Sequence, residues 1–500
     1  MDFNKADYSV IVSTLRRNFK DGYIAKYEKR LEQLQAIYRL VVDHQEEFHD
    51  AGYKDLRKPT TEACFADTQF VNRECGDAIK ALKTWMKPEN ISTDLLNMQH
   101  SAKILHDPLG VVLVMGAWNY PVQLCFIPLI GAIAAGNCVI IKPSELSIHT
   151  TELMTKLIEQ CLDPDIVQVV NGGVEETTEL LKERFDKIFF TGSPSVGKII
   201  MKAASQYLTP VDLELGGKCP AIVDETCDMQ LVANRISWAR YTNAGQLCIA
   251  TDYVLCISDN VQDRLIECLK KTLDGFYGEN AQESPDFGRI LNLRNFKRLQ
   301  KLIDPSKVVY GNHLDEKDLY ISPTIMKNVS SDDPVMQEEI FGPILPVLSV
   351  ANVDEAVEFV QENEKPLALY VFSKKNDVVN DILARTSSGT VCVNDCVLQV
   401  GITNLPFGGV GMSGMGCYHG KYTYDAFTHR KSCLFTKQKN ESMNKFRYPP
   451  YDYNGRAMRI VKWLLTPNGK PAGISWSVTL LLTSLTLGIL ASVYKYLLNV

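Results

Sequence analysis

The stretch VDLELGGKCPAIV, residues 211–223, is a largely hydrophobic run that carries a carboxylate, Glu214, just before two glycines. A lone carboxylate has no packing reason to be there, because burying its charge costs free energy unless it is paired. The following segment ends in NAGQLC, residues 243–248, where backbone N–H groups near Cys248 could stabilise a thiolate. The two residues therefore suggest a base and a nucleophile. The alternative is a structural role, since most cysteines in a chain that has 14 of them are small buried hydrophobes.

The region from residue 110 onward alternates short β-branched runs with helical stretches, after residues 2–90 that read as helices. The strand-like runs are Val111–Met115, Val139–Ile141, Ile166–Val170 and Ile188–Phe190. This alternation predicts an α/β fold with a doubly wound parallel sheet of the kind that binds dinucleotides. A second α/β segment follows, with strand-like runs at Pro220–Val223, Tyr253–Ile257 and Thr390–Asn394.

The composition of the chain is ordinary for a globular protein, and its length allows more than one domain. It has 500 residues, of which 45% are hydrophobic and 22% charged, and a net charge of −6 that argues against nucleic-acid binding. The start of the chain has no apolar stretch of the secretory type, so we expect reduced thiols rather than a disulfide framework. With no CxxC pair and no HExxH motif, no metal site is predicted.

Seven motifs in a fixed order resemble the NAD(P)-dependent aldehyde dehydrogenase superfamily, and within it the class 3 group that includes membrane-anchored fatty aldehyde dehydrogenases. The motifs are GAWNYP at 116–121, IKPSE at 141–145, FTGSPSVGK at 190–198, LELGGK at 213–218, GQLC at 245–248, EEIFGP at 338–343 and PFGGVGMSGMGCYHGK at 406–421. The chain departs from the usual pattern of the family at Leu247, Thr251 and Gln399. We expect these departures to affect which substrate fits rather than the chemical steps.

The resemblance implies a role for each of three catalytic candidates. Cys248 would attack the aldehyde carbonyl, and the Asn119 amide with the Cys248 backbone N–H would stabilise the oxyanion. Glu214 would be the general base that activates water for hydrolysis of the thioester, with Glu339 as a second candidate base. Lys218 receives no role. Without its motif, Asn119 would read as an ordinary turn residue before Pro121.

Cofactor binding is expected at GSPSVG, residues 192–197, which follows a strand and opens a helix, so that Gly192, Ser193, Val196 and Gly197 could receive a pyrophosphate. Taken alone, this pattern is more often plain turn chemistry. The resemblance further implies that Lys142 and Glu145 hold the adenosine ribose and that Glu339 and Phe341 lie at the nicotinamide end. Otherwise these residues are solvated loop and surface residues. A carboxylate at 145 favours NAD, with NADP possible.

The domain organisation is also implied by the resemblance. We expect N-terminal helices and an NAD-binding domain over 1–213 with bridging strands near 94–110, a catalytic domain over 214–410, and a bridging segment over 411–436. The strand-like piece Tyr418–Phe435 would pair across the subunit interface of a homodimer.

The C-terminus predicts a membrane anchor. The uncharged apolar run 474–494 would span about 30 Å as a helix, which matches a bilayer core, and a basic linker over 437–473 precedes it. The alternatives are a buried core helix and a merely solvated linker. Basic flanks stay cytosolic, so we expect a cytosolic catalytic body, with the endoplasmic reticulum as the expected membrane.

These features predict oxidation of medium- to long-chain aliphatic aldehydes to acids, with Tyr120 and Trp238 lining an apolar substrate funnel. Two alternatives stay open: transfer of the acyl group to coenzyme A, and a catalytically silent membrane-anchored scaffold.

Overall fold

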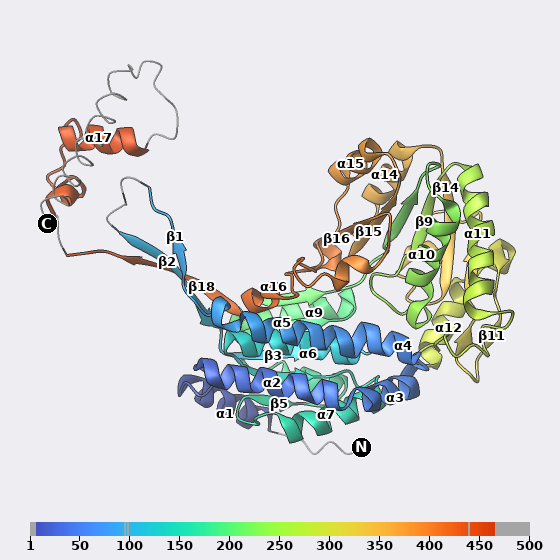
Figure 1. Cartoon of the computed structure of the whole chain (residues 1–500), viewed down its shortest axis with the longest axis horizontal. Coiled ribbons are helices and arrows are strands. Elements are labelled where there is room, and N and C mark those ends of the chain that lie inside the picture. The colour runs from blue at the N-terminus through green and yellow to red at the C-terminus, as the bar shows by residue number, and fades with distance from the viewer. Residues whose placement is uncertain (1–6, 95–96, 98–99, 439–440, 466–500) are drawn as a thin grey trace, which may run out of the picture. The chain divides into compact units, whose positions relative to one another are not determined.

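The computed structural model describes residues 7–94, 97, 100–438 and 441–465 (Figure 1). They fall into two compact units. The first lies within Met1–Lys87 and His106–Arg430, and the second within Pro88–Leu105 and Lys431–Val500.

A six-stranded sheet forms the centre of one half of the first unit. Its order is β17-β7-β6-β3-β4-β5, and all neighbours run parallel except β17 and β7. The strands are β3 (Val111–Met115), β4 (Cys138–Lys142), β5 (Val167–Val169), β6 (Lys187–Thr191), β7 (Val211–Glu214) and β17 (Gly414–Met415). β3, β4 and β6 are buried at every residue, as expected for parallel strands covered on both faces.

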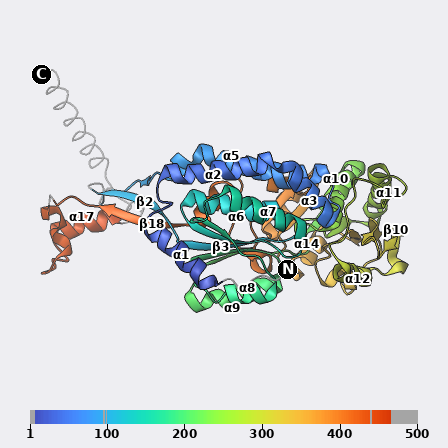
Figure 2. The ribbon, with the colours of Figure 1, turned by 90° about the horizontal axis from the view of Figure 1, so that it is seen from below.

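Helices cover both faces of this sheet: Figure 2 shows α6 and α7 on one side and α8 and α9 on the other. The helices of this half are α1 (Tyr8–Lys20), α2 (Tyr27–Asp43), α3 (Gln45–Leu56), α4 (Thr60–Ala63), α5 (Gln69–Trp85), α6 (Pro121–Ala135), α7 (Ile148–Cys161), α8 (Val174–Leu180), α9 (Pro194–Ala204) and α16 (Lys421–Ala426). α6 is apolar all round and almost completely buried between β3, β4 and the layer of α2 and α5. It begins at Pro121 and ends at Ala135, and the next residue, Gly136, has a φ of +96° that suits glycine.

A seven-stranded sheet, in the order β10-β13-β14-β9-β8-β15-β16, forms the other half of the first unit, and all its pairs except β10–β13 are parallel. Its strands are β8 (Pro220–Val223), β9 (Tyr253–Ile257), β10 (Val308–Tyr310), β13 (Thr324–Met326), β14 (Ile344–Val350), β15 (Ala368–Phe372) and β16 (Thr390–Val393). The remaining elements of this half are a short hairpin of β11 (Leu314–Asp315) and β12 (Tyr320–Ile321) and the helices α10 (Met229–Tyr241), α11 (Asp259–Tyr277), α12 (Leu293–Leu302), α13 (Pro334–Gln337), α14 (Val353–Glu362) and α15 (Asn376–Arg385).

The second unit holds β1 (Glu89–Ile91) and most of β2 (Ser101–Pro108) and β18 (Thr428–Phe435), which pair in a three-stranded sheet. It also holds the amphipathic helix α17 (Arg456–Leu465). The expected strand over Tyr418–Phe435 is wrong in its first half. Gly420, at φ +52°, precedes the short helix α16, which places the ring of Tyr424 in the core, and the strand begins only at Thr428.

Within the described residues, no helix has the length and apolarity that a membrane crossing needs. The predicted span at 474–494 lies outside the described residues.

Candidate active site

The carboxyl edge of the six-stranded sheet gathers most of the predicted site residues. β3 leads directly into the GAWNYP loop that carries Asn119, and β4 ends at Lys142. β6 is followed by Gly192, and β7 ends at Glu214. Ligands of open α/β sheets bind at this edge, so the strand order explains why motifs far apart in sequence meet.

Glu214 is buried, with only 4% of its surface exposed. β17 pairs antiparallel with β7, and Gly414 lies opposite Glu214, so the chain's late glycine-rich motif covers this carboxylate. Burial raises the pKa of Glu214 well above its ordinary value, and the nearby carboxylate of Asp212 adds to the effect. The raised pKa favours the protonated, neutral form of this carboxyl.

Cys248 stands in a tightly folded loop after α10. Asn243 and Ala244 both have φ of +52°, and Gly245 follows at +77°. A side chain at Gly245 would meet the carbonyl oxygen of Gly342 at 2.2 Å, so only glycine allows the loop to approach the EEIFGP segment this closely. This packing brings the half-buried Cys248 beside the segment that carries Glu339.

The pKa of Cys248 is raised by burial first and then by the carboxylates of Glu339 and Glu214. The backbone N–H groups of Cys248 and Ile249 act in the opposite direction, as the sequence predicts, but burial and the two carboxylates outweigh them. The electrostatic coupling shows that the structure brings the predicted nucleophile and both predicted bases together. The raised pKa favours the neutral form of the thiol.

Asn119 is 3% exposed and tied to the nucleophile loop. Its side-chain Nδ2 donates to the carbonyl oxygen of Gln246 at 3.1 Å, which leaves the second N–H of the amide for another acceptor. Gln246 is itself fixed, because its Nε2 donates to the carbonyls of Asn243 and Arg289, at 3.0 Å and 2.9 Å. Sequence reasoning quoted Gln246 within its motif but gave it no role.

Glu339 lies against the Gly216-Gly217 turn after β7. A side chain at Gly216 would come within 2.1 Å of Glu339 Oε2, so the glycine makes room for the carboxylate. Burial, followed by the charge of Asp252, raises the pKa of Glu339 to about 8, opposed by the Gly217 amide and by the cations Lys218 and Arg240. Glu339 Oε1 is buried without a hydrogen-bond partner among the described residues, which suits an atom that awaits a ligand hydroxyl.

A buried ionic cluster around Asp252, 2% exposed, holds this segment in place. Asp252 accepts from Lys218 Nζ at 2.5 Å, from Arg240 at 3.0 Å and from the backbone N–H of Ile340 at 3.1 Å. Lys218 also donates to the carbonyls of Val335 and Glu338, both at 3.0 Å. Lys218, which the sequence left unassigned, is thus a structural anchor, and Asp252 had no signal in the sequence.

The turn between β6 and α9 has the form of a phosphate cradle. Ser193 caps α9, and its hydroxyl accepts from the Val196 N–H at 3.4 Å. A side chain at Gly192 would meet the ring of Phe190 at 2.4 Å, and one at Gly197 would meet Leu215 at 3.1 Å. The two glycines therefore allow close packing of the turn. It forms the N-terminus of an 11-residue helix, whose dipole favours a pyrophosphate, although Pro194 has no N–H and the Val196 and Gly197 N–H groups already donate to Ser193.

Lys142 and Glu145 form an ion pair, with Lys142 Nζ 2.9 Å from Glu145 Oε2. The lysine side chain is 8% exposed and the glutamate side chain 41%, so the carboxylate faces solvent at the end of β4 while the ammonium lies below it. A ribose at this place would meet a carboxylate whose charge is partly balanced.

The aromatic candidates differ in exposure. Phe341 is half-buried and packs edge-on against Trp118 at 5.4 Å between ring centroids, next to the nucleophile loop. Trp238, on α10, is half-buried, whereas Tyr120 is only 4% exposed and offers little surface to a substrate. Within the described ranges, no group of three or more His, Cys, Asp or Glu side chains is placed to hold a metal, and the 14 cysteines, all of them described, are free.

The arrangement is a half-buried thiol with two carboxylates and a side-chain amide, set at the edge of a dinucleotide-type sheet. The aldehyde dehydrogenase family model matches residues 2–433. Aldehyde dehydrogenase family 3 member B2 of Mus musculus is 50% identical over 438 residues, which cover 88% of this chain and 91% of that protein. The mouse protein described as dimeric, NADP-preferring aldehyde dehydrogenase is 47% identical over 445 residues, 89% of this chain and 98% of that one. A solved structure, the substrate-bound state of Staphylococcus aureus AldH, matches with a TM-score of 0.88 at 42% identity, over 91% of this chain and 99% of that one.

The chain therefore belongs to the aldehyde dehydrogenase family, in its class 3 group. It is an oxidoreductase that acts on an aldehyde with NAD(P).

Proposed function

We propose that this protein oxidises aliphatic aldehydes of medium to long chain to carboxylic acids, with NAD as the hydride acceptor and a thioester on Cys248 as the intermediate. The observation that carries the proposal is the hydrogen bond that ties the Asn119 amide to the loop of Cys248, where the carboxylates of Glu339 and Glu214 raise the pKa of the thiol.

The first half of the reaction forms a carbon–sulfur bond. The Cys248 thiol gives its proton to a carboxylate or water, and its sulfur attacks the aldehyde carbon. The free N–H of the Asn119 amide and the Cys248 backbone N–H would donate to the oxygen that becomes negative. A nicotinamide cofactor held by the cradle residues and Glu339 would supply the acceptor for the hydride of the adduct, so that a thioester would remain on Cys248.

The second half hydrolyses the thioester. Glu214 would take a proton from water as the water attacks, and the Cys248 sulfur would leave and be reprotonated. A raised pKa suits this role, because the carboxyl must accept and release a proton near neutral pH. Glu339 would hold the nicotinamide ribose through its unpartnered Oε1 and would be the second candidate base.

The cradle of Gly192, Ser193, Val196 and Gly197 would hold the pyrophosphate, and the Lys142–Glu145 pair would hold the adenosine ribose. One mouse relative is named NADP-preferring, so the proposal of NAD for this chain rests on the exposed carboxylate of Glu145. Trp238 and Tyr120 are proposed to border the substrate entrance. Tyr120, which is 4% exposed, would contact the substrate only with its few exposed atoms.

The proposed domain division follows the sequence, with an NAD-binding domain over 1–213, a catalytic domain over 214–410, a bridging segment over 411–436, a linker over 437–473 and an anchor over 474–494. A homodimer would form through the bridging segment, as the name of the dimeric mouse relative suggests. The anchor would place the enzyme on a membrane, with the endoplasmic reticulum proposed. The surface of α17 supports this, because Ile460, Trp463 and Leu465 are at least half exposed on a helix that also carries three basic residues.

Product analysis with aldehydes of two to twenty carbons tests the proposal. The expected result is NADH and free acid in equal amounts, with the highest kcat/KM among the longer chains. Formation of an acyl-coenzyme A when coenzyme A is supplied, without free acid, would favour the acylating alternative. Absence of NADH formation with every aldehyde would favour the silent scaffold.

A further inference from the structure

Lys58 is a buried cation that the catalytic scheme leaves without a function. It precedes α4 and is 1% exposed, although a lysine is rarely buried unless it is paired. Its Nζ donates to the backbone carbonyl oxygen of Asn119 at 2.7 Å and lies 3.2 Å from Asp67 Oδ2. It also stands 4.0 Å from the centre of the Tyr120 ring.

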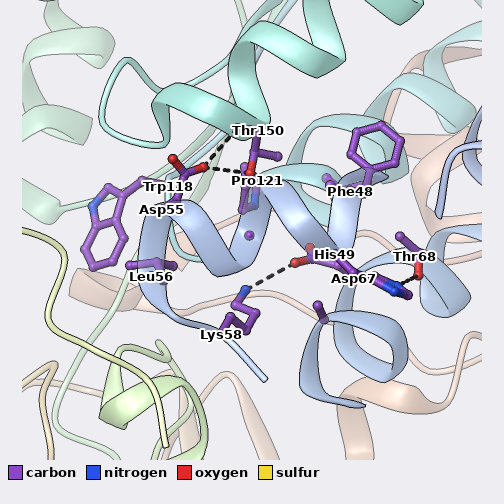
Figure 3. Close-up of a pocket in the computed structure, with 13 residues that line it drawn as sticks. Phe48, His49, Asp55, Leu56, Lys58, Asp67, Thr68, Trp118, Pro121 and Thr150 are labelled. Carbon is purple, nitrogen blue, oxygen red and sulfur yellow. Dashed lines mark hydrogen bonds and ion pairs between the residues drawn. The ribbon is translucent and has the colours of Figure 1, made fainter. Parts of the chain in front are cut away.

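The counter-ion of Lys58 is tied to the same loop. Asp67 is 5% exposed, and its other oxygen, Oδ1, accepts from the backbone N–H of Gln123 at 3.1 Å, in the first turn of α6. Lysine and aspartate thus hold both sides of the turn that runs from Asn119 through Tyr120 into the helix. Figure 3 shows the Lys58 ammonium directed toward Asp67, in a small pocket whose lining also includes Trp118 and Pro121.

A second contact from the same segment reaches the nucleophile loop. Glu62 Oε2, within α4, accepts from the backbone N–H of Asn243 at 2.8 Å, at a residue whose φ of +52° is unfavourable without support. Asn243 Nδ2 in turn donates to the Asn119 carbonyl at 3.2 Å and to the Gln246 carbonyl at 3.1 Å. The segment 58–62 therefore meets both loops where they touch each other.

The geometry points to Lys58 as a positioning residue for Asn119: its ammonium fixes the Asn119 backbone so that the side-chain amide points one N–H at Gln246 and keeps the other directed to the oxyanion. A charge-assisted hydrogen bond is stronger than a neutral one and keeps its geometry well in a buried site. The Asn119 peptide cannot rotate without breaking this bond and leaving a buried ammonium short of a partner. Lys58 itself touches no reacting atom.

The inference rests on the proposed role of Asn119, and a double-mutant cycle separates the two. The variants are Lys58→Met, Asn119→Ala and their combination, and the measurement is the single-turnover rate of NADH formation with limiting propanal. Lys58→Met should lower this rate by roughly 10- to 100-fold, the usual effect of losing a bond to a charged group or of misplacing a reacting group by about 1 Å. In the Asn119→Ala background, Lys58→Met should lower the single-turnover rate by less than about 3-fold, because the amide that Lys58 positions is already absent.

Two further readouts exclude a general structural effect. The rate of Cys248 alkylation by iodoacetamide, without cofactor, should stay within about 2-fold in Lys58→Met, since the thiol loop keeps its own contacts to Gln246. Arg30→Met is the matched control. Arg30 is a buried cation, 6% exposed, that donates to the Ala134 carbonyl at 3.1 Å at the other end of α6, and its loss should lower the melting temperature without changing the burst rate of folded protein.

Equal losses from Lys58→Met in both backgrounds, or a parallel loss of alkylation, would overturn the positioning role while leaving Asn119 in place. An unchanged single-turnover rate in Asn119→Ala would show that Asn119 does not stabilise the oxyanion, and the inference about Lys58 would fail with it. If Lys58→Met does not fold, Lys58→Arg serves instead, because arginine keeps the charge beside Asp67 but replaces the single ammonium by a longer, planar group whose donors have a different geometry toward the Asn119 carbonyl. A folded Arg variant with the wild-type burst rate would equally overturn the inference.

Discussion

Lys142 Nζ lies 2.9 Å from Glu145 Oε2, so the carboxylate expected to meet the adenosine ribose already has a cationic partner. The partner weakens the repulsion that a lone glutamate would exert on a 2′-phosphate. The carboxylate can still accept from a 2′-hydroxyl, because its side chain is 41% exposed.

Glu145→Gln should therefore narrow the preference for NAD over NADP by roughly 10-fold, which is the worth of one charged hydrogen bond. The measurement is the ratio of kcat/KM for the two cofactors. Glu152→Gln, a change of the same kind at an exposed position on α7, serves as the control. An unchanged ratio in Glu145→Gln would remove this residue from cofactor selection.

Asp252→Asn should destabilise the protein by about 3–5 kcal/mol, because it leaves Lys218 and Arg240 buried without a counter-ion. Urea denaturation followed by fluorescence measures the change. Asp354→Asn is the comparison, since Asp354 pairs with Arg385 at the surface with 72% of its side chain exposed, and its loss should cost less than about 1 kcal/mol. Similar losses for the two variants would mean that Asp252 is not a central anchor.

Much of the fold could be predicted from the sequence, because parallel strands covered on both faces are continuous apolar runs. Val111–Met115 is a strand over its expected bounds, and the runs beginning at Val139 and Ile188 gain only an end residue on each side. The region 418–427 could not be predicted by alternation, since a helix of six residues buries Tyr424 there through tertiary packing. Short local patterns do not carry that information.

The site was predictable where a residue type is out of place in its local context, as with Glu214 in an apolar strand. Lys58, Asp67 and Asp252 were given no role, because each becomes buried only when distant segments meet. Asp252 directly precedes the apolar strand β9, where an acidic residue is typical of a turn. Their hydrogen-bond partners are far away in the sequence and are set by the tertiary structure alone. Lys58 and Asn119 are 61 residues apart, Asp67 and Gln123 are 56 apart, and Asp252 and Ile340 are 88 apart.

Glu74→Gln should change how stability depends on pH. Burial raises the pKa of Glu74 to about 7 from 4.5, so the folded protein holds a proton that the unfolded chain releases, and wild-type stability falls as pH rises from about 4.5 to 7. Glutamine keeps an oxygen for the Gly420 N–H and has no proton to lose. As pH rises from about 4.5 to 7, the variant should therefore become more stable relative to the wild type, by roughly 3 kcal/mol above pH 7.

Thermal unfolding at pH 5 and pH 8 checks this prediction, with the exposed Glu159→Gln on α7 as the control. A constant difference between Glu74→Gln and the wild type at the two pH values would show that Glu74 is ionised in the folded protein throughout.

Deletion of residues 474–500 should release the protein from membranes if this segment is the proposed anchor. The rate on short aldehydes should be nearly unchanged, while the rate on long-chain aldehydes held in vesicles should fall, because these substrates partition into lipid at about 0.8 kcal/mol per CH₂. Sedimentation after alkaline carbonate washing measures attachment. A truncated protein that still sediments would contradict the anchor, and an undiminished rate with vesicles would contradict its role in substrate access.

Cys248→Ala should abolish aldehyde oxidation while NAD still binds, since the thiol forms the covalent bond and the cofactor cradle uses other residues. Isothermal titration with NAD and a steady-state assay measure the two properties. Oxidation that persists in Cys248→Ala would mean that another group is the nucleophile.

Rapid-mixing measurement of NADH formation by Glu214→Gln tests the catalytic account most directly. The account assigns Glu214 to hydrolysis of the thioester, so the first turnover should keep its wild-type amplitude and rate while steady-state turnover falls by about 100-fold or more. Quenched enzyme should then carry the acyl group on Cys248 by mass spectrometry. If burst and steady state fall together and no acyl-enzyme accumulates, Glu214 does not act in hydrolysis and the proposed mechanism is contradicted.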